Sequence, residues 1–207
     1  MKTLVFGMLA GLILFSPVAL AAPFLHTPSP SNNAFVGGGV RVISINITDD
    51  NLNTSSVILR IISLNAYQQG ETWDVYSMSC AGSSTEWNCT RSLSFAIAGS
   101  DTIELFYFEA NDTDGILGNN GTSSNPLRFT LDRNPPVISF TSPANDSYVS
   151  RNKTILLTVT DASSGVNNNT VQYSTDGSQW TTISNTTPTS FSSAWSTASC
   201  SNNQTVT

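Results

Sequence analysis

The sequence is poor in charged residues, histidine and cysteine. Asp, Glu, Lys and Arg make up only 11% of its 207 residues, and it contains one histidine and three cysteines. So little charge argues against helical bundles and coiled coils, while a hydrophobic content of 39% is too high for a disordered tail. A single histidine and the lack of clustered carboxylates exclude most hydrolytic and zinc chemistry. We therefore expect a chain that is not an enzyme.

Basic residues are the scarcer charge. Eight Lys and Arg stand against 14 Asp and Glu, the net charge is −6, and no basic cluster occurs. Binding to nucleic acid or anionic lipid needs clustered Lys and Arg, so we expect neither as a partner. Small polar residues are abundant, with 31 Ser, 25 Thr and 20 Asn. This composition favours an extracellular β protein.

The N-terminal segment has the pattern of a secretory signal peptide. Lys2 supplies the positive charge, Leu4–Phe15 the apolar stretch, and Ala19-Leu20-Ala21 the cleavage pattern. Ser16-Pro17 interrupts the apolar run before it reaches the roughly 20 residues that a membrane span needs. We predict that residues 1–21 are removed, that the mature chain has no transmembrane segment, and that the protein is secreted, extracellular or on the cell surface.

Export permits disulfides and glycans. Cys80 and Cys89 flank a plausible turn, Ala-Gly-Ser-Ser, so we predict a disulfide that closes a hairpin, with Cys200 left without a partner. Two free thiols are the alternative.

Asn-x-Ser/Thr triplets, the acceptor pattern for N-glycosylation, are about twice as frequent as the composition predicts. A host without the glycosyltransferase would leave these asparagines unmodified. These glycosylation candidates are Asn46, Asn53, Asn88, Asn111, Asn120, Asn145, Asn152, Asn168, Asn185 and Asn203.

Strands dominate the pattern. Ile43, Ile45 and Ile47 alternate with polar residues, which predicts a strand with one buried face. Thr102–Ala110 is apolar on both faces, as suits a central strand packed on two sides. Ser174–Gly177 has the composition of a hairpin turn. No sustained helical period follows the signal peptide, so we predict an all-β Greek-key sandwich.

The chain also matches itself, which indicates an internal duplication. Three ordered pairs of segments correspond: 30–36 with 143–149, 43–49 with 155–161, and 70–73 with 177–180.

The paired prolines Pro135-Pro136 mark a boundary, because they end a strand and stiffen a connection. We predict a first domain over 22–134 and a second over 135–207. The second lacks counterparts of Thr102–Ala110 and of the last strand of the first domain. We therefore expect a truncated second domain, or one that another chain completes by strand exchange.

Four segments carry a family resemblance: DRNPPV from Asp132, TSPANDSYV from Thr141, LTVTDASSGV from Leu157 and YSTDGSQW from Tyr173. They resemble the tandem immunoglobulin-like repeats of secreted and cell-surface proteins of bacteria and archaea. The resemblance implies an all-β, immunoglobulin-like β-sandwich in two tandem copies, the second incomplete. The hairpin cysteines depart from the antibody type, whose disulfide spans the two sheets.

Asp112, Asp114 and Asn119 are candidates for a calcium site. They lie in NDTDGILGNN, where a glycine-turned loop offers the oxygens that hard cations prefer. No Glu closes an EF-hand pattern, and an Asn-Asp-Gly turn without a metal is the alternative. We predict no other cofactor.

Tryptophan could indicate a surface that stacks on sugars. Trp73 and Trp180 occupy equivalent positions in the two copies, so we expect both to pack in sandwich cores. Trp87 lies two residues before Cys89, so we expect it to shield the disulfide. For Trp195 the sequence suggests no structural role. His26, in an extended Pro-rich run, is expected to be solvated.

The predicted function is that of a non-catalytic structural or adhesive module, with protein or glycan partners on a surface. The alternative is an accessory or carbohydrate-binding region of an exported enzyme whose catalytic domain is not in this sequence. The sandwich fold serves both roles and does not separate them.

Overall fold

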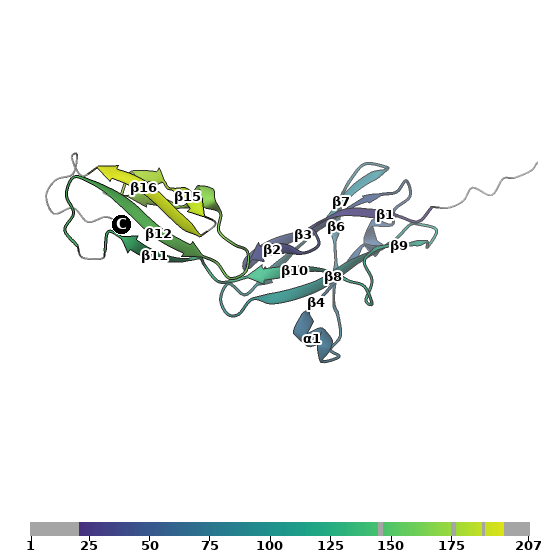
Figure 1. Ribbon diagram of the computed structural model, residues 1–207. Helices are drawn as coiled ribbons and strands as arrows, with labels where there is room; N and C mark the ends of the chain where they lie inside the picture. Colours follow the sequence, from purple (N-terminus) through teal and green to yellow (C-terminus); the bar gives the residue numbers. More distant parts are fainter. Residues whose placement is uncertain (1–20, 145–146, 175–176, 188, 197–207) are drawn as a thin grey trace, which may run out of the picture.

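The computed structural model describes residues 21–144, 147–174, 177–187 and 189–196. It is an all-β chain in two lobes that lie end to end (Figure 1). The first lobe contains β1 Phe24–Ser29, β2 Ala34–Gly37, β3 Gly39–Thr48, β4 Ile58–Ser63, β5 Asp74–Ser77, β6 Ser79–Gly82, β7 Glu86–Phe95, β8 Thr102–Asn111, β9 Leu117–Asn120 and β10 Leu127–Asp132. The second contains β11 Val137–Ser142, β12 Asn152–Thr160, β13 Gln172–Ser174, β14 Trp180–Thr182, β15 Ser184–Thr187 and β16 Ser190–Ser196.

The first domain is a sandwich of two sheets. One sheet has the order β1-β3-β7-β6, and the other has β2-β10-β8-β4-β5 with β9 paired to β8. This is the strand order of an immunoglobulin-type Greek key, with the first edge split between the sheets as β1 and β2. All pairs in these sheets are antiparallel except β2 with β10, which is parallel.

Period-two alternation builds the core of this domain, as the sequence predicts. Ile43, Ile45 and Ile47 of β3 are fully buried and face Phe106 and Phe108 of β8 across the sandwich. The predicted central strand is confirmed, because β8 lies between β10 and β4 and is buried over most of its length. Burial of these aliphatic and aromatic side chains is the main stabilising term of the domain.

The predicted disulfide is confirmed. Cys80 of β6 and Cys89 of β7 lie directly opposite each other, with their Cα atoms 4.0 Å apart. The bond therefore joins neighbouring strands of one sheet and does not span the two sheets. A stable disulfide is compatible with an oxidising compartment.

The second domain repeats part of this plan. The order β11-β12-β16-β15 matches β1-β3-β7-β6, and the hairpin β13-β14 matches β4-β5. Its core includes Ile155, Leu157 and Val159 of β12, with Phe191 and Trp195 of β16. Among the residues that the structure describes, this domain has no counterpart of β2, β8, β9 or β10.

Two features differ from the sequence-based expectations. A short helix, α1 Leu64–Gln68, follows β4, with Ser63 as its N-cap. The expectation that Trp73 and Trp180 pack in the sandwich cores is wrong: Trp73 is outside the core cluster and Trp180 is exposed. Trp73 instead packs on the outer face of the sheet, between Tyr67 of α1 and Tyr107 of β8, at ring-centroid distances of 5.7 and 4.9 Å.

The described part of the chain contains no helix that is long and apolar enough to cross a membrane. The predicted signal peptide lies almost entirely outside the described residues. So do Cys200, Asn145 and Asn203.

Candidate functional site at the domain junction

One carboxylate connects the two domains and the segment between them. Asp101 belongs to the loop between β7 and β8 of the first domain. It accepts hydrogen bonds from the backbone N–H of Arg133 at 2.9 Å and from Nδ2 of Asn134 at 2.8 Å. Its second oxygen accepts a hydrogen bond from the hydroxyl of Ser163, which follows β12 in the second domain. Asp101 therefore fixes both the linker and the neighbouring loop.

Arg133 holds the start of the linker on the first domain. Its guanidinium donates to the carbonyl of Ser100 at 2.8 Å and to the hydroxyl of Thr102 at 3.0 Å. Its Nε is buried and has no hydrogen-bond partner among the described residues. Together with Pro135 and Pro136, whose rings restrict the backbone, these bonds leave the linker little freedom.

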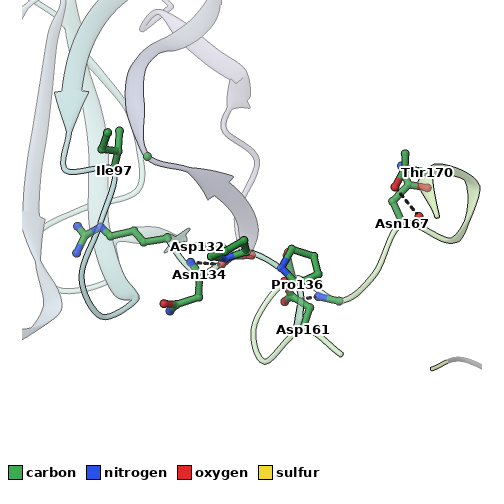
Figure 2. Close-up of a pocket in the computed structure, with 12 residues that line it drawn as sticks. Ile97, Asp132, Asn134, Pro136, Asp161, Asn167 and Thr170 are labelled. Carbon is green, nitrogen blue, oxygen red and sulfur yellow. Dashed lines mark hydrogen bonds between the residues drawn. The ribbon is translucent and has the colours of Figure 1, made fainter. Parts of the chain in front are cut away.

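A groove of about 520 Å³ lies at this junction (Figure 2). Exposed Ile97 lines it from the first domain, and Asp161 and Asn167 line it from the second. The carboxylates of the groove are bound to nearby backbone: Asp132 accepts from the N–H of Asn134 at 3.2 Å. Asp161 accepts from two N–H groups of its own turn at 2.9 and 3.0 Å. These hydrogen bonds shape the loops that line the groove.

Hydrogen bonding lowers the pKa of Asp101 below its usual value. The largest cause is the backbone N–H of Arg133, followed by the hydroxyl of Ser163. An acid with a lowered folded-state pKa stabilises the fold above its unfolded pKa, and this contribution is lost as the pH falls through the folded pKa. The junction is therefore expected to be firm at neutral pH and to weaken in acid.

The calcium candidates do not all come together. Asp112 and Asp114 lie in the loop between β8 and β9, whereas Asn119 lies within β9, opposite Glu109 of β8. The loop instead meets the end of β3, where Nδ2 of Asn51 donates to Asp114 at 2.7 Å. Asn51 lies 63 residues before Asp114 in the chain, and no local sequence pattern connects the two.

Asp112 is 2% exposed and mainly serves its own turn, since Oδ1 accepts from the N–H groups of Asp114 and Ile116 at 2.9 and 2.7 Å. Its Oδ2 is buried without a partner among the described residues. Burial is the largest cause that raises the pKa of nearby Asp49, with the charge of Asp112 adding to it. In the described part of the chain, no group of three or more His, Cys, Asp or Glu is arranged to hold a metal ion. Calcium binding stays a prediction.

The remaining candidates have structural contacts. Nε2 of His26 lies 3.1 Å from the hydroxyl of Thr48, and its ring stacks on Phe24. Among the glycosylation candidates, the amide nitrogens of three already donate hydrogen bonds: Asn46 to Thr27, Asn88 to Asn46 and Asn120 to the carbonyl of Leu25.

Comparisons with known proteins give little further information. No family model matches the chain, and no curated protein matches it. Among solved structures, CopC from Methylosinus trichosporium OB3b is similar over 53% of this chain and 93% of that protein, with 16% identity and a TM-score of 0.33. This likeness is too slight to assign a function.

Proposed function

We propose that the chain is a non-catalytic module of an exported surface protein, in which tandem sandwiches form an elongated structural or adhesive unit. The observation that carries the proposal is the junction: Asp101 binds Arg133 and Asn134 of the linker and Ser163 of the second domain. Such bonds restrict the angle between the domains. A restricted angle suits a unit that spaces or presents a binding surface.

Small-angle X-ray scattering of the purified chain tests the proposal. The wild-type chain should give one elongated envelope, whereas Asp101→Ala should broaden the distance distribution, because linker and loop lose their shared acceptor. Asp50→Ala removes an exposed carboxylate elsewhere in the first domain and serves as the control. If Asp101→Ala and the wild type give identical scattering, the hydrogen bonds of Asp101 do not set the arrangement of the two domains.

The exported location is supported by the signal-peptide pattern and by the disulfide. Protease treatment of intact cells measures it directly. An exported module should be cleaved, and should carry Cys80 and Cys89 in oxidised form. Recovery of an intact, fully reduced protein from the cell interior would contradict the proposal.

A further inference from the structure

The first domain contains a second cavity, between its two sheets, with a volume of about 420 Å³. Acidic side chains point into it from strand positions that face the core. Asp74 of β5 lies opposite buried Ile61 of β4, so both side chains are on the inner face of the sheet. Glu104 of β8 alternates with the buried core residues Phe106 and Phe108 and therefore also points inward.

Glu104 is nine-tenths buried, with 9% of its surface exposed, and it is incompletely paired. One carboxylate oxygen accepts a hydrogen bond from the hydroxyl of Thr102 at 3.0 Å. The other has no hydrogen-bond partner among the described residues. The guanidinium of Arg133 donates to the hydroxyl of Thr102 and forms no hydrogen bond with Glu104. Burial is the largest cause that raises the pKa of Glu104. The positive charge of Arg133 acts to lower that pKa. The second oxygen is not among the fully buried polar atoms of the described residues, so it is accessible from the cavity that Glu104 lines.

The rest of the cavity combines apolar walls with negative charge. Leu93 and Phe95 of β7 line one side, and Tyr76 of β5 lines the other. The exposed carboxylates of Glu71 and Asp74 add charge to the lining, which includes no Lys, Arg or His. Arg91 stacks on Tyr76, with its guanidinium 5.2 Å from the ring centroid. It is not part of the lining.

We propose that this cavity binds an organic cation: an ammonium or guanidinium group on an aliphatic stem, as in a Lys or Arg side chain. The stem packs on the apolar walls, and the cation pairs with the open oxygen of Glu104 near Asp74. The volume lies in the range of small-molecule sites. A metal ion is disfavoured, because the described carboxylates are not arranged to hold one. The site is independent of the proposed role of the junction.

Titration with n-butylguanidinium and n-butylammonium, followed by amide chemical shifts of the ¹⁵N-labelled chain at low salt, tests the proposal. Saturable shifts should appear at residues 61–63, 93–95 and 104. n-Butylurea has nearly the same shape as n-butylguanidinium without its charge, and it should bind at least tenfold more weakly. Equal binding of the urea, or shifts that appear with Ca²⁺ and not with the organic cations, would overturn the proposal.

Glu104→Gln should weaken cation binding about tenfold or more while the domain keeps its fold. Asp50→Asn makes the same change in charge outside the cavity and should leave the affinity nearly unchanged, which controls for long-range electrostatics. If Glu104→Gln does not fold, Asp74→Asn provides the second variant and should also weaken binding. Unchanged affinity in the folded Glu104→Gln variant, or no saturable shifts in the wild type, would contradict the site.

Discussion

Leu25 and Ile138 occupy the same position in the two domains but have very different surroundings. Leu25 of β1 pairs with Ile47 of β3, and Ile138 of β11 pairs with Val159 of β12. Leu25 is 4% exposed, whereas Ile138 is 58% exposed. Their strands are alike, so the difference comes from what covers them.

In the first domain β9 supplies that cover. Nδ2 of Asn120 donates to the carbonyl of Leu25 at 2.9 Å, and a Cβ added to Gly118 would lie 2.0 Å from the carbonyl oxygen of Pro23. Among the described residues, the second domain has no strand in the place of β9. Alternation along a strand thus selects its inner face, but burial of that face depends on a segment far away in the sequence.

The largest expected effect is a difference between two matched substitutions. Leu25→Ala should lower the free energy of unfolding of the first domain by about 2–5 kcal/mol, the usual cost of emptying a buried leucine site. Ile138→Ala should cost less than about 1 kcal/mol in the second, because its side chain is already half in water. Native-state hydrogen exchange of amides in β3 and β12 reports the two domains separately. Equal losses would show that Ile138 is covered in solution.

Removal of the disulfide should affect only the domain that contains it. For a loop of about ten residues, the chain-entropy model gives roughly 2–3 kcal/mol. Cys80→Ser combined with Cys89→Ser should therefore lower the melting temperature of the first domain by several degrees. Amide exchange in β12 should not change. Calorimetry of oxidised and reduced wild-type protein provides the control, and coincident melting curves would contradict a stabilising bond.

Gly118→Ala tests the contact between β9 and β1. The added methyl group meets the backbone of Pro23, which cannot move aside easily, so β9 should separate from β1 at a cost of about 1–3 kcal/mol. Gly37→Ala is the matched control, because its methyl group would meet the flexible end of Arg41 and no backbone atom. Chemical denaturation measures both variants. Similar free energies of unfolding for Gly118→Ala and Gly37→Ala would show that β9 can move away from β1 without loss of stability.

The smallest expected effect concerns pH and Glu104, a residue without a counterpart among the described residues of the second domain. Its raised folded-state pKa stabilises the fold fully below the unfolded pKa, and this contribution is lost as the pH rises through the folded pKa. Glu104→Gln should therefore be at least as stable as the wild type at pH 7 and lose that advantage at pH 4. The change should be smaller than that of Gly118→Ala. Urea denaturation at the two pH values measures it, and a marked destabilisation at pH 7 would show that the charge is well compensated.

Local patterns in the sequence were sufficient to predict strand β3 and the disulfide. The alternation of Ile43, Ile45 and Ile47 predicts β3 and its buried face, and the spacing of Cys80 and Cys89 predicts their hairpin. The role of Trp73 was not predictable in this way, because it depends on α1 folding over the outer face of the sheet.

The candidate sites were harder to predict for the same reason. Asp101 reaches a linker 32 residues further along the chain and a serine 62 residues away. Glu104 is one of two glutamates in the stretch TIELFYFEA, and its spacing of two and four residues from Phe106 and Phe108 was the available signal that it shares their face. What it faces follows from the pairing of β4 with β5 and β8, which a single sequence does not specify.

The parallel pairing of β2 with β10 has a mechanical consequence. β2 lies near the start of the first domain and β10 at its end, and Ala34–Gly37 pair with Phe129–Asp132 in the same direction. Tension between the two ends of this domain would pull these strands past each other along their length. The hydrogen bonds between them would then share the load and break together, whereas bonds opened from one end break in succession. The first domain should therefore resist extension along this direction.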